Sequence, residues 1–285
     1  MRYYRVDDRV LASSPDGTWD LTAGSPHIED FASLGKAAAI ADLTIDEVAR
    51  RRCTDDNRIE TENPPVGAAA PLVPAEVWAA GVTYRVSESA REAESTMPDM
   101  YRDVYDADRP EIFFKATPSR TVGPGEPVGI RADSAWDVPE PELGLVFIGE
   151  KIVGYTIGND MSSREIEGAN PLYLPQAKIY DRCCAIGPCV ASTETVEDPL
   201  DLELSMEIER DGAVVFDDST STSELVRDPT ELAEYYTRHN VVQTGSVLLT
   251  GTGLVPPDDF TLEAGDEVSI TVEEIGTLRN VVSVV

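Results

Sequence analysis

The chain contains 285 residues and carries a formal net charge of −30, because 53 Asp and Glu outnumber 23 Lys and Arg. A chain of this length can bury a sizeable core. Its acidity disfavours nucleic acids and anionic membranes as partners. Only four of the cations are lysines, and such a surface is most simply explained by solvation in concentrated salt, which screens the repulsion. We therefore expect a cytoplasmic protein of a halophile.

The N-terminal part combines strand and helix patterns. Residues 1–20 alternate like short strands, with a turn at 14–17. A helix is expected over Leu43–Arg52, where Thr44 suits the N-cap position. The Pro- and Ala-rich run Thr61–Pro74 breaks both periodicities. We therefore expect a small N-terminal α+β domain with its linker in residues 1–73 and a larger domain in residues 74–285.

The larger domain begins with two expected strands, Val77–Tyr84 and Pro110–Lys115, separated by a polar helical stretch over Ser87–Glu94. Mixed charges at helical spacing usually mark a solvated face. Ser87 would instead line a site if this stretch covered one. Lys115 is notable because a sequence with so few lysines is expected to keep one where it has a role, which includes a salt bridge.

The stretch from Pro139 to Asp160 has the pattern of a β-hairpin. Two apolar runs, Leu143–Ile148 and Ile152–Ile157, flank a short loop containing Gly149. Folding the stretch about Glu150 gives three informative pairs: Ile148 with Ile152, Glu142 with Gly158, and Glu140 with Asp160. Since opposed residues share a face of the sheet, the three carboxylates of Glu140, Glu142 and Asp160 point the same way.

Crowded carboxylates either hold protons or hold a cation. A site with only oxygen ligands suits Mg²⁺, Mn²⁺ or Ca²⁺ better than zinc. The alternative is a surface hairpin whose carboxylates lie in water, and the spacing alone does not decide between the two.

The rest of the chain is expected to be mainly β. A long irregular segment over residues 159–188 contains Arg164, Lys178 and Asp181, and long ordered loops in enzymes are often functional. Strands then meet across a turn at residues 211–212, a helix runs from Asp228 to about His239, and further strands close the chain.

Several classes of protein are excluded or disfavoured. No run approaches the ~18 apolar residues that a membrane-spanning helix needs, and the first residues lack a signal-peptide core. The two histidines, His27 and His239, give no plausible Ser-His-Asp arrangement, and no glycine-rich nucleotide loop is present. The four cysteines fit reduced thiols. What remains is chemistry with a metal, a lysine and a carboxylate, which suits proton abstraction beside a carbonyl.

Several motifs over residues 75–285 together resemble the fumarylacetoacetate hydrolase family. They are Glu140–Leu143, Gly154–Asp160, Ser163-Arg164, Lys178 with Asp181, Gly187-Pro188, Leu249–Gly253, Ala264–Asp266 and Ile275–Leu278. The resemblance implies the β-rich fold of that family and a divalent cation, Mg²⁺ or Mn²⁺, held by Glu140, Glu142 and Asp160. It also implies a homodimer or homotetramer, and substrates whose 2-oxo acid end chelates the cation.

Within the family, the stretches Arg109–Ala116, Val122–Glu126 and Asn170–Lys178 are most similar to the 2-keto-3-deoxy-pentonate dehydratases. The resemblance implies dehydration of a 2-oxo sugar acid to 2,5-dioxopentanoate. Lys178 and Glu111 are then the catalytic pair, without a decision as to which is the base. The implied substrate contacts are Thr252, Tyr84, Ser87 and Lys115.

Other functions stay open at this point. Hydrolytic members of the family carry a histidine where this chain has Ser87, so hydrolysis is disfavoured. An acylpyruvate-type hydrolase or decarboxylase remains an alternative, as does a salt-adapted binding protein or structural protein without activity.

Overall fold

A computed structural model describes residues 1–285 except 24, 26, 63–64 and 85–106. The described chain contains more strand than helix, and most of its strands belong to two sheets, which confirms the expectation of a mainly β fold with some α. The large sheet has the order β4 (Arg58–Ile59), β3 (Gly17–Asp20), β2 (Arg9–Ser14), β1 (Arg2–Val6), β14 (Cys184–Ser192), β12 (Lys151–Asp160), β11 (Pro141–Ile148), β17 (Ser246–Thr252), β6 (Val77–Gly81) and β7 (Glu111–Ala116), with β5 (Ala68–Ala69) on β1 and β8 (Thr121–Val122) on β14.

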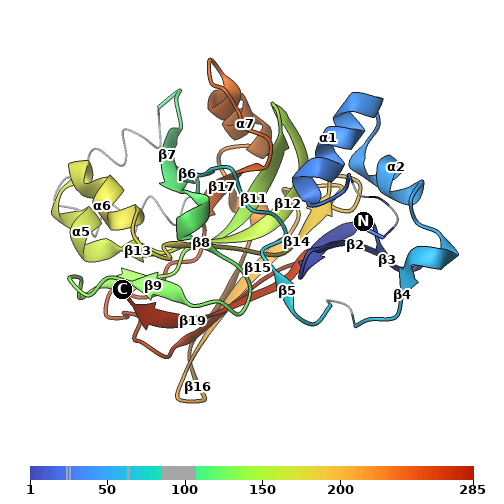
Figure 1. Ribbon diagram of the computed structural model, residues 1–285. Coiled ribbons are helices and arrows are strands. Elements are labelled where there is room, and N and C mark those ends of the chain that lie inside the picture. The colour runs from blue at the N-terminus through green and yellow to red at the C-terminus, as the bar shows by residue number, and fades with distance from the viewer. Residues whose placement is uncertain (24, 26, 63–64, 85–106) are drawn as a thin grey trace.

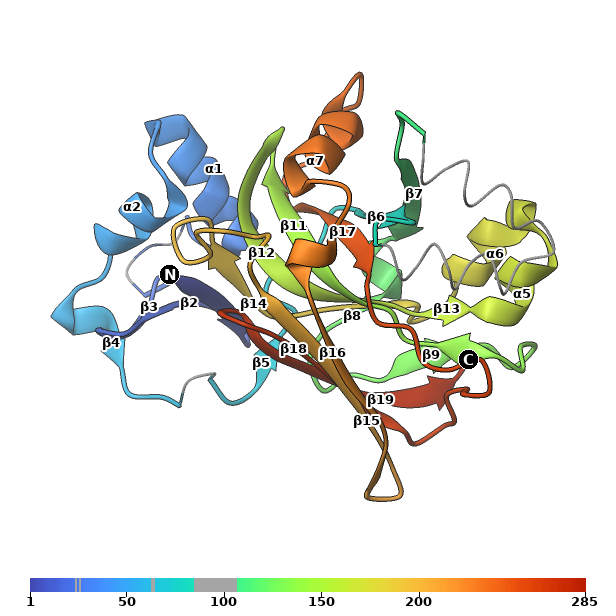
Figure 2. The same ribbon diagram turned by 180° about the vertical axis from the view of Figure 1, so that it is seen from behind.

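The smaller sheet has five strands, and two further short strands form a separate pair. The five are, in spatial order, β16 (Ala213–Ser221), β15 (Glu203–Arg210), β18 (Glu267–Val272), β19 (Gly276–Val284) and β9 (Val128–Ile130), and the pair is β10 (Asp137–Val138) with β13 (Ser162–Ser163). Strands β12 and β14 of the large sheet contact β18 and β19 of the smaller one. Figure 1 shows the smaller sheet below the large one, and the β15–β16 hairpin extends away from the body in both ribbon views (Figures 1 and 2).

The helices are short and surround the sheets. They are α1 (Phe31–Ala41), α2 (Ile45–Arg50), α5 (Arg164–Ala169), α6 (Leu174–Lys178) and α7 (Pro229–Thr237). The expected cap at Thr44 is confirmed, because its side chain accepts a hydrogen bond from the Glu47 amide. The expected helix start at Asp228 is also confirmed, and the Asp228 side chain accepts a hydrogen bond from the Thr230 amide. No helix in the described part of the chain is long and apolar enough to cross a membrane.

The N-terminal strands extend the same large sheet that contains the hairpin. β1 pairs with β14, where Arg2 lies opposite Ala191, and β5 within the expected linker pairs with β1. One sheet thus runs through both parts of the chain. The division into two domains between residues 73 and 74 stays a prediction.

The expected hairpin is formed by β11 and β12, and its pairing at the carboxylate end is confirmed. Glu142 lies opposite Gly158, and the Asp160 amide donates a 2.9 Å hydrogen bond to the Glu140 carbonyl. Near the turn the expected pairing was wrong, because Ile148 lies opposite Lys151 and not Ile152. The turn is one residue shorter than expected, and a bulge next to Val146 restores the expected register.

Apolar packing fixes this hairpin in place. Leu143, Leu145, Phe147 and Ile157 alternate along the two strands and are completely buried. The ring of Phe147 lies 5.2 Å from that of Tyr236 in α7, which covers this part of the sheet. Burial of one such side chain contributes about 1.5–3 kcal/mol of stability. This packing therefore stabilises the two strands that carry the carboxylates.

Three segments differ from the sequence-based expectations or lie outside what can be compared with them. The stretch 159–188 was expected to be irregular but contains α5 and α6, whose helical segments of six and five residues are too short for a periodic pattern. Helix α1 was not expected. The polar stretch over residues 87–94 lies outside the described residues.

Candidate active site

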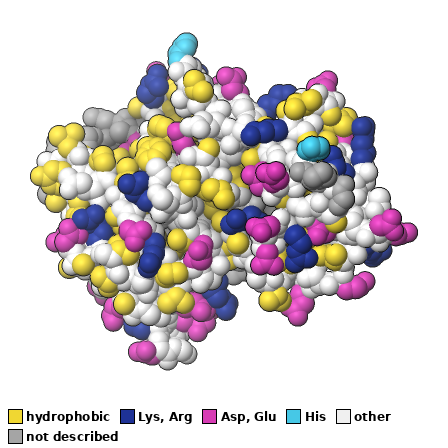
Figure 3. Space-filling view, viewed as in Figure 1, with side chains coloured by type: hydrophobic (Ala, Val, Ile, Leu, Met, Phe, Trp, Pro, Cys, Tyr) yellow, Lys and Arg dark blue, Asp and Glu magenta, His cyan; other side chains and the backbone are white. Residues whose placement is uncertain are grey.

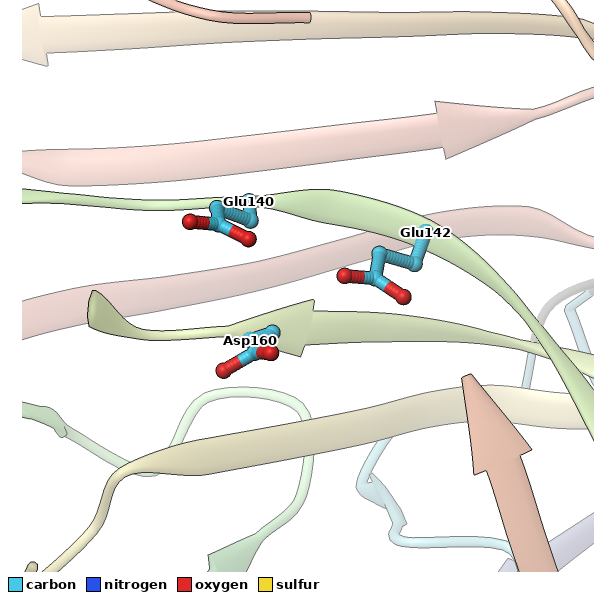
Figure 4. Close-up of side chains that lie close together, drawn as sticks. All are labelled: Glu140, Glu142 and Asp160. Atoms are coloured by element: carbon cyan, nitrogen blue, oxygen red, sulfur yellow. The ribbon is translucent and has the colours of Figure 1, made fainter. Parts of the chain in front are cut away.

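The three carboxylates predicted to share a face do converge in the structure. Glu140 directly precedes β11, Glu142 lies within it, and Asp160 ends β12. Figure 4 shows the three side chains, from neighbouring strands, around one shared space. One oxygen from each lies within 4.8 Å of the others, and all three residues are at most 3% exposed. The surface-hairpin alternative is therefore wrong, because these carboxylates are shielded from water.

Lys178, at the end of α6, reaches into the same space. Its ammonium donates hydrogen bonds to Glu140 Oε2 at 2.9 Å, to Asp160 Oδ2 at 3.3 Å and to Ser162 Oγ at 2.6 Å. The ring of Phe113 lies 5.7 Å from the ammonium. The predicted catalytic lysine thus lies directly beside two of the predicted metal ligands.

A second group of donors pairs with one oxygen of each carboxylate. The Arg164 guanidinium lies 3.2 Å from Glu140 Oε1, and the Gly251 amide donates a 2.5 Å hydrogen bond to Glu142 Oε2. The ammonium of Lys115 lies 2.5 Å from Asp160 Oδ1. Each carboxylate therefore has one oxygen paired with a donor other than Lys178.

The local field still favours an additional cation. Burial raises the pKa of Glu142 well above its usual range, and the charges of Asp160 and Glu140 raise it further, whereas Lys178 and the Gly251 amide lower it. Among the described residues, the site gathers four buried carboxylates and three buried cations: Glu140, Glu142, Asp160 and Glu167, with Lys115, Arg164 and Lys178. The excess of negative charge and the oxygen-only ligands fit a divalent ion such as Mg²⁺ or Mn²⁺.

A small pocket opens beside the carboxylates, with a cavity volume of about 20 Å³, which is room for about one water molecule. Its lining residues come from five regions of the chain: Ala80, Gly81, Val82, Glu111, Phe113, Glu140, Asp160, Glu167, Leu174, Lys178 and Thr252. The predicted catalytic pair, Lys178 and Glu111, therefore lines one pocket together with two of the predicted metal ligands.

The predicted substrate contacts have different positions. Thr252 lies in the pocket wall opposite Glu142 in the sheet. Tyr84 is buried, and its ring lies where a Cβ atom on Gly253 would project. Burial, followed by the charge of Glu142, raises the pKa of the Tyr84 hydroxyl. Ser87 lies outside the described residues.

Lys115 does not line the pocket. It is completely buried, and its ammonium donates to the backbone carbonyls of Met161 and Lys178 besides pairing with Asp160. Burial lowers its pKa, but the interactions with Asp160, Cys183 and Cys184 together raise it by more, so the net shift is upward and the ammonium stays charged. This position behind Asp160 does not suit the expected direct contact with substrate.

Sequence reasoning left four site residues without a role. Arg164 and Glu167 are buried in α5 and lie 3.5 Å apart through Nη1 and Oε2. Arg164 follows Asp160 by four residues in a motif that was recognised, so a signal for it was present. The sequence offered no signal for Phe113 or Gly81, because aromatic residues and glycines are common in strands.

Comparisons with known proteins give consistent results along the chain. The family described as Fumarylacetoacetate (FAA) hydrolase C-terminal matches residues 76–283. The chain is 56% identical to a probable 2-keto-3-deoxyxylonate dehydratase of Haloferax volcanii, over 100% of both proteins. It is 44% identical to the 2-dehydro-3-deoxy-D-arabinonate dehydratase of Saccharolobus solfataricus, over 73% of this chain and 72% of that protein.

A solved structure extends the similarity to the whole fold. A 2-keto-3-deoxy-D-arabinonate dehydratase complexed with magnesium and 2,5-dioxopentanoate superposes with a TM-score of 0.84. The sequences are 34% identical, and the match covers 100% of this chain and 99% of the other. The similarity thus includes residues 1–75, which precede the family match.

Proposed function

Because the chain belongs to the fumarylacetoacetate hydrolase family, we propose that it is a metal-dependent dehydratase that converts a 2-keto-3-deoxy-pentonate to 2,5-dioxopentanoate and water. The observation that carries the proposal is the pocket in which Lys178 and Glu111 accompany the buried carboxylates. The similarity to two pentonate dehydratases over most or all of the chain supports the choice of substrate.

Glu140, Glu142 and Asp160 would hold a magnesium or manganese ion. When bound, the ion would polarise the 2-oxo group of the substrate and so make the C3 protons more acidic. Without a metal ion, the buried carboxylates of the site outnumber its buried cations by one. A bound divalent ion would therefore make the net charge of these buried groups positive. The site therefore favours an anionic substrate, as the carboxylate of a sugar acid is.

Lys178 is assigned the removal of the C3 proton. Its ammonium lies beside Glu140 and Asp160, where the 2-oxo acid end would bind, so C3 comes next along the substrate. The lysine must lose a proton before it can accept one. The neighbouring Ser162 hydroxyl, 2.6 Å from Nζ, fixes its position.

Glu111 is assigned the departure of the C4 hydroxyl. It shares a face of β7 with Phe113, which lies under Lys178, and residues two apart on a strand are separated by about 7 Å. Glu111 therefore suits the part of the substrate beyond C3. It would donate a proton to the C4 hydroxyl, which leaves as water while the C3–C4 double bond forms.

The remaining steps are a tautomerisation. The C5 carbon and its hydroxyl each lose a proton, and C3 and C4 each gain one, so the C5 alcohol becomes the aldehyde of 2,5-dioxopentanoate. Protons exchanged with solvent will therefore appear at C3 and C4 of the product.

Product identity tests the proposal. The protein is incubated with 2-keto-3-deoxy-arabinonate and 2-keto-3-deoxy-xylonate and MgCl₂ in molar KCl, and the products are identified by NMR. We expect 2,5-dioxopentanoate with deuterium at C3 and C4 in D₂O. Pyruvate with glycolaldehyde would mean aldol cleavage and contradict the proposal. Activity only on a cleavable diketo acid would favour the hydrolase or decarboxylase alternative.

We propose, further, that the protein works in a salt-rich cytoplasm. The support is the charge of −30 and four cysteines without disulfides. Figure 3 shows acidic side chains spread over the visible face and not gathered in one patch. A spread of this kind suits solvation in salt better than binding of one basic partner.

A homodimer or homotetramer is the assembly that we propose. The small sheet exposes Val214 and Val215 on β16 and Val281 and Val284 on β19. Strand β16 ends the order of the described sheet, and such an edge strand can pair with another chain. Sedimentation in molar KCl tests the assembly, and a monomer at micromolar concentration would contradict it.

A further inference from the structure

Lys115 follows two residues of the pocket along β7 but is not part of the pocket itself. Glu111 and Phe113 lie two residues apart and point to the same side, and Lys115 is the extra residue of a bulge between Phe114 and Ala116. The first two line the pocket, whereas Lys115 is completely buried behind Asp160. A buried cation in this position acts on the carboxylate and not on the substrate.

The contacts of Lys115 connect the Asp160 side chain to the backbone of the catalytic candidate Lys178. Its ammonium lies 2.5 Å from Asp160 Oδ1 and donates to the carbonyls of Met161 and Lys178. The other Asp160 oxygen, Oδ2, is the one that faces Lys178 Nζ at 3.3 Å. The two oxygens of Asp160 therefore have separate partners.

The same division applies to the other two carboxylates. Arg164 holds Glu140 Oε1, while Glu140 Oε2 lies near Lys178. The Gly251 amide holds Glu142 Oε2. In each carboxylate one oxygen is paired with a donor other than Lys178.

We propose that Lys115 is a positioning residue that restricts Asp160 to one metal-binding oxygen and, together with Arg164 at Glu140, makes the site selective for Mg²⁺ or Mn²⁺ over Ca²⁺. The inference rests on the proposed function, because it requires that a divalent cation binds at the carboxylates. It adds the means by which the protein chooses among cations.

The physical reason lies in the coordination that each cation prefers. Mg²⁺ demands a near-ideal octahedron with oxygens at 2.0–2.1 Å, whereas Ca²⁺ takes six to eight oxygens and readily binds both oxygens of one carboxylate. Three single carboxylate oxygens leave three positions of an octahedron for the substrate and water. The same three oxygens supply too few ligands for Ca²⁺, since Lys115 and Arg164 withhold the second oxygens of Asp160 and Glu140.

Calorimetric titration of the apoprotein with MgCl₂ and with CaCl₂ in molar KCl tests the inference without using activity. Lys115→Met removes the ammonium and makes Asp160 Oδ1 available. We expect the ratio of the Ca²⁺ and Mg²⁺ dissociation constants to move toward Ca²⁺ by about tenfold, which equals 1.4 kcal/mol in relative binding free energy. Lys151→Met is the matched control, because it removes an exposed lysine at the far end of the same hairpin and should leave the ratio unchanged.

Two further variants keep the test decisive if Lys115→Met does not fold. Arg164→Met removes the donor at Glu140 Oε1 and should move the ratio in the same direction. Lys115→Arg keeps a cation beside Asp160 and should retain the selectivity of the original protein.

Water coordination gives an independent readout. In the Mn²⁺-loaded protein, proton relaxation of the solvent reports the number of waters on the ion. We expect fewer bound waters in Lys115→Met or Arg164→Met than in the original protein, because a second carboxylate oxygen replaces one. Failure of the original protein to bind any divalent cation would contradict the proposed function itself. Mg²⁺ binding with the same cation ratio and water number in all variants would overturn this inference alone.

Discussion

Gly81→Ala should reduce turnover by displacing Glu111 while leaving the predicted metal ligands untouched. Gly81 and Glu111 are opposite each other in the β6–β7 pair. A Cβ atom built on Gly81 would lie 2.1 Å from Glu111 Oε2 and 2.9 Å from its Cδ. Real Cβ atoms essentially never approach another heavy atom closer than 3.0 Å, so the Glu111 carboxyl group must move.

The size of the effect follows from that displacement. The carboxylate oxygen has to shift by roughly 1 Å, and a misplacement of this size in a catalytic group can reduce the rate by about 10²-fold. Such a loss corresponds to about 2.7 kcal/mol in the activation barrier. The fold should tolerate the change, because the atoms that must move are the far end of a flexible side chain and Gly81 has no left-handed backbone angle.

The assay compares kcat, Mg²⁺ affinity and thermal midpoint of Gly81→Ala with those of the original protein. Glu111→Gln provides the matched background, since the added methyl group should cause little further loss once the carboxylate is absent. A full additional loss of turnover in that background would mean that the methyl group obstructs the substrate directly. An unchanged kcat in Gly81→Ala would refute the role that we assign to the position of Glu111.

Four other outcomes are expected. Glu142→Gln should stay folded and lose the metal, because it removes a charge that the cation neutralises, and unchanged metal content by elemental analysis would contradict the assignment. Lys178→Ala should keep the metal and lose about 10²–10⁴-fold in turnover, whereas near-normal kcat would exclude it as the base. The thermal midpoint should climb with KCl, since the screening length shrinks from about 30 Å at 0.01 M to about 3 Å at 1 M, and a midpoint independent of salt would refute this. Burial raises the pKa of Asp137 to about 6, so the folded state binds its proton more tightly than the unfolded state and loses stability as the pH rises from about 4 to 6. Asp137→Asn should therefore raise the midpoint more at pH 8 than at pH 4.5, and an equal gain at both values would speak against this cause.

The sequence predicted the cluster of three carboxylates because their relation is local. Glu140, Glu142 and Asp160 lie on one hairpin, and strand alternation alone determines which side chains share a face. The prediction was robust for a specific reason. The turn is one residue shorter than assumed, and the bulge beside Val146 adds one residue back, so the register at the carboxylate end is as expected.

The surroundings of the ligands could not be derived in this way. Lys115 belongs to β7, which is separated from Asp160 in the large sheet by three other strands besides β12. Arg164 reaches Glu140 from α5, a six-residue helix without a recognisable period. The resemblance supplied Glu111 and Lys178, but neither it nor the periodicity gave the position of Lys115 behind Asp160.

This division between local and distant residues also bears on how the site forms. An isolated hairpin would bring three carboxylates together without any partner, and like charges opposite each other destabilise a sheet. The compensating cations arrive from β7, α5 and α6, which must dock before the carboxylates can be buried. Burial of a charge without its partner is strongly unfavourable, so the hairpin end and the docked elements should order together. The carboxylate cluster is thus specified by local pairing but stabilised by tertiary assembly, and a fragment that contains only the hairpin should not bind the cation.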